Sequence, residues 1–140
     1  MLSFSSIPSL NLTRISQISN VQFFGELTRA VKIKNHIWIA GTTATNEAGQ
    51  IVEGDAYDQT VQILRNIEAV LARTGATLKD VVRTRMFVRN ISENSEKIGR
   101  AHGQFFGDIR PVTSMIEVSN LISPEMLLEI EADAFLIPEE

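Results

Sequence analysis

The sequence predicts an α+β domain, in which a mixed β-sheet carries two helices packed on one face. Five stretches alternate apolar and polar residues at period two, as strands with one buried face do. Two other stretches carry apolar residues three and four positions apart, as amphipathic helices do. The order along the chain is strand, strand, helix, strand, helix, strand, strand. This order suits helices layered on one side of a sheet, and it leaves the other side without cover from this chain.

The first two strands are expected at residues 29–33 and 36–40, joined by a tight two-residue connection. Period two places Thr42 on the same face as Trp38, opposite the apolar face that we expect to meet the helices. Gly41 lacks a Cβ, so a ligand can approach its backbone amide closely. Thr42 and the Gly41 backbone are therefore candidate cleft residues, although a strand that simply ends in a loop would show the same pattern.

Two amphipathic helices follow from the apolar spacing and from the capping signals. Asp55 is a plausible N-cap for a helix of about five turns that ends near Gly75. Ser92 or Asn94 can cap the second helix, which is expected to run to about Phe106.

The strand expected at 80–88 turns two arginines away from its apolar face. The expected buried set is Val82, Thr84, Met86 and Val88, and the opposite set is Arg83, Arg85 and Phe87.

The last two strands lie between Arg110 and Phe135 and are joined by a loop that contains Pro124. Parity divides each of them into an apolar set, expected to be core, and a second set that is rich in carboxylates. The expected core sets are Ser114, Ile116, Val118 and Leu128, Ile130, Ala132, Ala134; the second sets are Thr113, Met115, Glu117 and Glu129, Glu131, Asp133. The carboxylates and the two arginines therefore share one sheet face, either as a salt-bridge network or as part of a site.

Length and composition limit the possible functions. A chain of 140 residues forms one domain, for which we expect boundaries at 21–140 after an N-terminal extension at 1–20 that is loose to about residue 15. The net charge of −4 and the lack of a basic run disfavour nucleic acid as a partner. No apolar run is long enough for a membrane span, so we expect a cytoplasmic protein that binds no membrane.

Metal chemistry is not expected from this sequence. It contains no cysteine, and its two histidines, His36 and His102, lie far apart in the chain without a ligand spacing. His102 falls on an apolar helix stripe, where a histidine is more often part of the packing than an acid or a base.

Four segments together resemble the reactive-intermediate deaminase family, also called Rid or YjgF. Residues 110–118 read RPVTSMIEV and residues 128–134 read LEIEADA, in the place of the family's C-terminal signature. Upstream, residues 82–88 read VRTRMFV and residues 35–42 read NHIWIAGT. The matching segments occur in the family's order from about residue 27 onward.

The resemblance implies a chorismate-mutase-like fold and a homotrimer with ligand clefts between its subunits. Active members hydrolyse enamines and imines from amino-acid metabolism to 2-oxo acids and ammonia, without a metal or an organic cofactor. By this resemblance Glu129 is the catalytic carboxylate near the attacking water, and the Gly41 amide meets the ligand carboxylate. Thr42, Thr113 and Met115 are the further candidates for substrate binding.

The sequence departs from the family at three positions of the expected pocket. The hallmark arginine, which pairs with the substrate carboxylate, is replaced by Thr113, a tyrosine is lost near Leu27, and a serine is replaced by Ala40. Arg85 could supply the missing charge. We therefore expect a deaminase with an altered substrate pocket; the alternatives are a trimeric protein that binds a small metabolite without turnover, and an endoribonuclease that inhibits translation.

Overall fold

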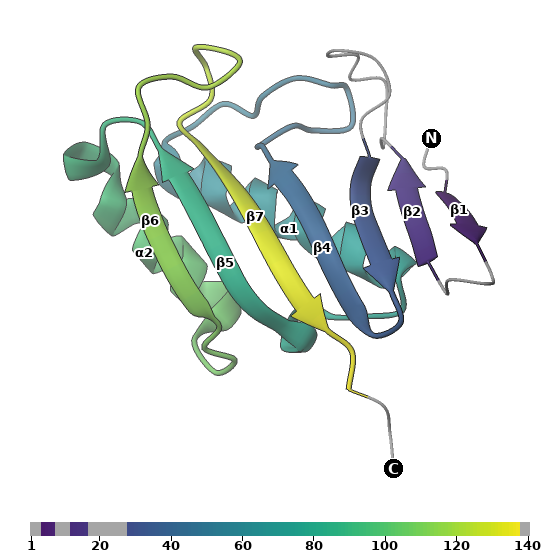
Figure 1. Cartoon of the computed structure of the whole chain (residues 1–140). Coiled ribbons are helices and arrows are strands. Elements are labelled where there is room, and N and C mark those ends of the chain that lie inside the picture. Colours follow the sequence, from purple (N-terminus) through teal and green to yellow (C-terminus); the bar gives the residue numbers. More distant parts are fainter. Residues whose placement is uncertain (1–3, 8–11, 17–27, 138–140) are drawn as a thin grey trace.

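The computed structural model describes residues 4–7, 12–16 and 28–137, and within them a sheet covered on one side by two helices (Figure 1). Seven strands form the sheet in the order β1-β2-β3-β4-β7-β5-β6. Only the β5–β6 pair is parallel, so the sheet is mixed as expected. The elements are β1 (Phe4–Ile7), β2 (Leu12–Ser16), β3 (Thr28–Ile33), β4 (His36–Thr42), α1 (Ala56–Arg73), the 3-10 turn η2 (Leu78–Asp80), β5 (Val81–Val88), α2 (Ile91–Phe106), β6 (Val112–Glu117) and β7 (Leu128–Phe135).

Strands β1 and β2 lie in the expected N-terminal extension. They form an antiparallel pair, and β2 continues the sheet along β3. For residues 4–7 and 12–15 the expectation of a loose segment is therefore wrong, because backbone hydrogen bonds incorporate both strands into the sheet. The domain boundary near residue 20 stays a prediction.

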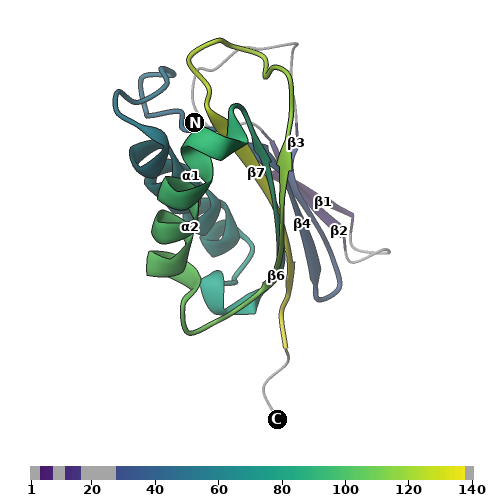
Figure 2. The same cartoon turned by 90° about the vertical axis from the view of Figure 1, so that its left-hand side faces the viewer.

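The helices pack side by side on one face of the sheet and leave the other open (Figure 2). Helix α1 begins at the predicted Asp55, whose carboxylate and that of Asp58 form a reciprocal capping box. Apolar residues of both helices and of the central strands form one core: Ile37, Ile39, Ile63, Leu64, Ile67, Leu71, Ile98, Leu128 and Ile130 are among its buried members. No helix within the described residues is both long and apolar enough to cross a membrane.

Helix α2 begins earlier than expected, and the prediction that Ser92 or Asn94 caps it is wrong. Its N-cap is Asn90, which adopts a left-handed conformation at φ 52° and makes no side-chain cap. Instead, the Glu117 carboxylate accepts a hydrogen bond from the Ile91 amide at 3.0 Å. The Asn94 side chain bonds to the Arg89 carbonyl. The cap therefore comes from a neighbouring strand, which local sequence does not reveal.

Two β-bulges change the face that some side chains occupy. One extra residue of β4 lies between Ile39 and Thr42, and one extra residue of β5 lies between Val81 and Arg83. A bulge reverses the alternation of side chains beyond it. As a result Val81 is buried while Val82, expected in the core, is 48% exposed.

The parity expected for β6 is also wrong. Thr84, Met86 and Val88 of β5 are buried, and the parallel register sets Thr113, Met115 and Glu117 beside them. Paired residues share a face, so this set of β6 points toward the helices. Ile116, expected in the core, lies on the other side and is 44% exposed. For β7 the expectation is confirmed, since Leu128, Ile130, Ala132 and Ala134 are all buried.

Candidate functional site

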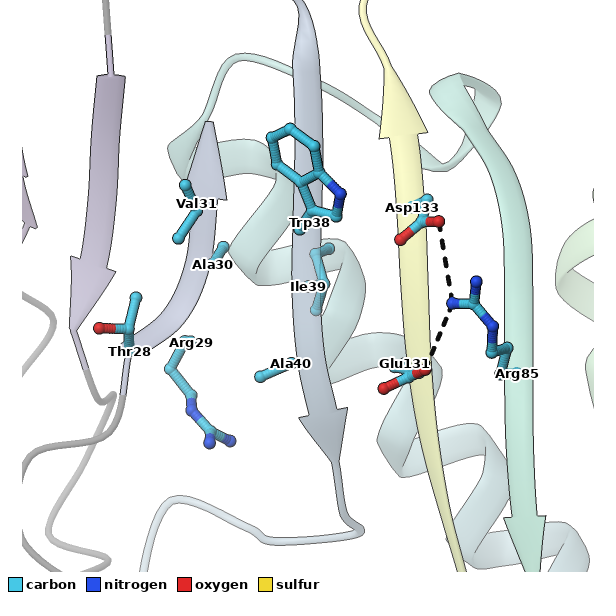
Figure 3. A pocket seen from close by; sticks show the side chains of 10 residues that line it. All are labelled: Thr28, Arg29, Ala30, Val31, Trp38, Ile39, Ala40, Arg85, Glu131 and Asp133. Atoms are coloured by element: carbon cyan, nitrogen blue, oxygen red, sulfur yellow. Dashed lines mark hydrogen bonds and ion pairs between the residues drawn. The ribbon is translucent and has the colours of Figure 1, made fainter. Parts of the chain in front are cut away.

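The sheet face opposite the helices, called the open face here, contains a shallow pocket of about 320 Å³. Strands β3, β4, β7 and β5 line it, and Figure 3 shows the lining side chains. They are Thr28, Arg29, Ala30, Val31, Trp38, Ile39, Ala40, Arg85, Glu131 and Asp133. The pocket thus combines an apolar floor with two arginines and two carboxylates, and it faces away from the core.

Arg85 is held by two carboxylates of the neighbouring strand. Its Nη1 lies 3.2 Å from Glu131 Oε1 and 3.8 Å from Asp133 Oδ2 (Figure 3). The three side chains are between 23% and 35% exposed, so solvent screens the pairs and their net stabilisation is small. The expected face of arginines and carboxylates is therefore confirmed for Arg85, Glu131 and Asp133, which form an ion-pair network. It is wrong for Glu117, which lies on the helix side.

Gly41 and Glu129 meet at the bulge of β4. A Cβ added to Gly41 would overlap Oε1 of Glu129 and would come within 2.6 Å of its Cδ. Only glycine leaves room for that carboxylate against the backbone. The structure thus brings together the expected catalytic residue and the expected amide of the site.

Glu129 and Arg29 influence each other's ionisation. Burial raises the pKa of the Glu129 carboxyl, the positive charge of Arg29 lowers it in part, and the negative charge of Glu131 raises it further. Burial lowers the pKa of the Arg29 guanidinium, and Glu129 opposes this. A desolvated, half-buried carboxyl with a raised pKa is a suitable group for accepting and returning a proton, and it lies next to pocket-lining residues such as Glu131.

Arg29 was not among the site residues expected from the sequence. Its position in β3 gave a usable signal, because Ala30 is buried and its neighbour must then face the opposite side. In the hairpin register Val31 pairs with Trp38, so Arg29 lies near Ala40 on the open face. Among the described residues, the buried Nε of Arg29 has no hydrogen-bond partner.

Thr42 does not reach the open face. The bulge in β4 pairs it with Ile130, a core residue, and its side chain is 7% exposed. Its hydroxyl donates to the Ala40 carbonyl at 2.8 Å. The expectation that the Thr42 side chain borders the cleft is therefore wrong, because the bulge directs this side chain to the core side of the sheet.

Thr113 and Met115 lie on the edge strand β6, with β5 between them and Glu129. Met115 packs against the core, and Thr113 is exposed at the rim on the helix side. Within one chain the structure does not bring these two residues together with Gly41. Their expected role in substrate binding stays a prediction. Leu27, the other departure noted in the sequence, lies outside the described residues.

A chain of hydrogen bonds begins at Thr113. Its Oγ1 lies 2.8 Å from Thr84 Oγ1, which in turn lies 3.0 Å from His102 Nε2. The Thr113 hydroxyl also reaches the Pro111 carbonyl at 3.2 Å. Burial lowers the pKa of His102, which favours its neutral form. His102 is thus a hydrogen-bonded packing residue, as expected.

The protein is a two-layer α+β domain whose open face places a carboxylate against a glycine. These features define its structural class, and comparison with known proteins identifies its family. A sequence model of the endoribonuclease L-PSP family matches residues 18–136. The chain belongs to this family, which is also the YjgF or Rid family, and the resemblance drawn from the sequence is confirmed.

Three relatives illustrate the match. A RutC family protein of Pyrococcus abyssi is 34% identical over 79% of this chain and 87% of its own length. The 3-aminoacrylate deaminase RutC of Acinetobacter baylyi is 30% identical over 75% of this chain and 82% of its own. The crystal structure of a YjgF/YER057c/UK114 family member from Mycobacterium tuberculosis is 48% identical, covers 79% of this chain and 86% of its own, and superposes with a TM-score of 0.70.

Proposed function

We propose that this protein is an enamine/imine deaminase that hydrolyses small 2-imino acids to 2-oxo acids and ammonia in a rebuilt pocket. The observation that carries the proposal is Glu129, a half-buried carboxyl with a raised pKa that lies against the Gly41 backbone beside an open pocket. The name of the Acinetobacter relative, a 3-aminoacrylate deaminase, supports the same reaction class.

The proposed reaction is a balanced hydrolysis. Water adds to the imine carbon, and the carbon–oxygen bond forms as the imine nitrogen takes up a proton. The carbon–nitrogen bond of the resulting amino alcohol then breaks, ammonia leaves, and a carbonyl remains. Glu129 accepts a proton from the attacking water and returns one to the leaving nitrogen, a task that suits a carboxyl with a raised pKa.

The pocket is completed, on this proposal, by a second copy of the chain in a homotrimer. The open face carries exposed apolar side chains, among them Trp38 and Ile116, beside charged ones. The edge strand β6 of one copy would bring Thr113 and Met115 to the Glu129 region of the next, because one chain alone keeps them apart. The small-molecule cleft would then lie between subunits.

Turnover separates this function from that of a trimeric metabolite-binding protein. A PLP-dependent dehydratase would generate 2-imino acids in situ, and the release of 2-oxo acid would be followed with and without the protein. We expect acceleration by the wild type and its loss in Glu129→Gln, since the amide keeps the shape and lacks the base. Arg83→Gln, which changes an exposed residue outside the pocket lining, is the matched control.

Two results would contradict the deaminase. Full turnover by Glu129→Gln would show that this carboxylate has only a structural role. No acceleration by a well-folded wild type would favour the binding protein. The family description also includes an endoribonuclease. The net charge of −4 disfavours an RNA substrate, and an RNA cleavage assay at low salt, where such binding is strongest, tests this directly.

A further inference from the structure

The hydroxyl at position 113 is a poor replacement for a carboxylate-binding arginine. A threonine has one proton to donate, and here that proton has two protein acceptors within reach, Thr84 Oγ1 and the Pro111 carbonyl. Any arrangement that keeps both contacts directs the Thr113 proton to a protein oxygen. A ligand carboxylate at this position would face lone pairs, so the anion must be held elsewhere.

Arg85 is also a weak candidate for this role. Two carboxylates already pair with its guanidinium, at 3.2 Å and 3.8 Å, so the local charge of the group is negative. A substrate carboxylate that approached Arg85 would be repelled by Glu131 and Asp133. The compensation by Arg85 that we considered from the sequence would require this network to break.

Arg29 lines the same pocket as Arg85, but it forms no direct ion pair with a described carboxylate. Its positive charge acts on Glu129. Its Nε is buried without a hydrogen-bond partner among the described residues. Leaving a buried donor unpaired is costly, so the guanidinium gains free energy if it shifts to meet an acceptor that a ligand supplies.

We propose that Arg29 anchors the carboxylate of the substrate, so that a small 2-imino acid lies between the Arg29 guanidinium and the Glu129 carboxylate. The anion site of this pocket has thereby moved from position 113 on β6 to β3. Two parallel N–H donors of a guanidinium match the two oxygens of a carboxylate. The inference deepens the proposed deaminase function and rests on it for the identity of the ligand.

The test measures binding without turnover. Calorimetric titration with 2-oxobutanoate, the stable product-like acid, would be compared with titration by its neutral amide. We expect Arg29→Gln to weaken 2-oxobutanoate binding roughly 10- to 100-fold, the usual loss when a charged bidentate pair is removed, and to leave amide binding unchanged. Arg83→Gln should leave both affinities unchanged, and Thr113→Val should leave the preference for 2-oxobutanoate over the amide unchanged. In the imine assay Arg29→Gln should raise KM more than it lowers kcat.

Every other outcome overturns the assignment. Unchanged 2-oxobutanoate affinity in Arg29→Gln removes Arg29 from the site, and a loss of 2-oxobutanoate affinity in Thr113→Val that spares amide binding returns the anion to β6. If the wild type binds no 2-oxobutanoate yet hydrolyses imines, the proposed role of Arg29 in binding the carboxylate is wrong, while the proposed deaminase function is retained. Circular dichroism checks the fold. Should Arg29→Gln not fold, Arg29→Lys replaces it, because lysine keeps the charge and lacks the two parallel donors of a guanidinium. This variant must weaken carboxylate binding several-fold, or the proposal fails.

Discussion

At the scale of single residues, the contact between Gly41 and Glu129 makes a sharp prediction. Gly41→Ala places a methyl group where the carboxylate lies, so Glu129 must swing away from the bulge. We expect turnover to fall at least tenfold while the fold remains, because a displaced base no longer reaches the attacking water. Gly99→Ala in α2 is the matched control, since a Cβ there meets nothing within 4 Å. Equal activity of the two variants would disprove a positional role for Gly41.

His102 makes a prediction about acid stability. Burial lowers its pKa in the folded protein below the ordinary 6.5, so the unfolded chain binds more protons between the two values. The contribution of His102 to the free energy of unfolding is therefore present above pH 6.5 and is lost as the pH falls through the folded pKa. Urea denaturation at a series of pH values should show this loss in the wild type and a smaller one in His102→Gln. Parallel curves for the two proteins would contradict it.

Some residues of the candidate site could be assigned from the sequence, and others could not. Glu129 and Gly41 could be assigned by resemblance, and the structure brings them into contact. Thr42 could not be placed, because the bulge that buries it depends on the pairing of β4 with β7, a strand nearly 90 residues away in the chain. Arg29 could have been placed from the alternation of β3, but its neighbourhood with Glu129 requires knowing which strands are adjacent.

Periodicity predicted every α-helix and strand from β3 onward, and it failed on parity at three strands, first at Thr42 in β4. Val82 is apolar and exposed because of the bulge in β5. Ile116 is apolar and exposed because the register with β5 sets Met115 and Thr113 on the helix side. An apolar side chain on an edge strand fits either a core or an interface, and only strand pairing distinguishes them.

The cap of α2 is a testable feature at this scale. Glu117 of β6 accepts a hydrogen bond from the Ile91 amide, while the N-cap Asn90 makes no side-chain cap. Glu117→Ala should lower the free energy of unfolding by about 1 kcal/mol, as the loss of other helix N-caps does. Glu96→Ala, on the exposed side of the same helix, should change it by less than about 0.5 kcal/mol. Chemical denaturation measures both, and equal effects would mean that Glu117 does not cap the helix.

The open face of the sheet is the surface through which the chain can associate with other copies. The helices cover one side of the sheet (Figure 2). On the other side Trp38, Ile116 and Phe135 remain between 40% and 46% exposed. Large apolar side chains gathered on one face beside paired charges favour association with other copies. Such association would also enclose the pocket, which is shallow in the single chain, and would strengthen the electrostatic interactions within it.

The proposed homotrimer can be tested by a substitution on the open face. We expect the wild type to elute as a trimer in size-exclusion chromatography with light scattering at micromolar concentration, and Ile116→Lys to dissociate, since it would place a charge inside the interface. Ile137→Lys, at a position that is 75% exposed beyond the end of β7, should leave the trimer intact. If the cleft lies between subunits, Ile116→Lys must also lose imine hydrolysis although Glu129 and Arg29 are unchanged. A wild type that stays monomeric, or a dissociated Ile116→Lys that keeps full turnover, would place the whole site within one chain and remove Thr113 and Met115 from it.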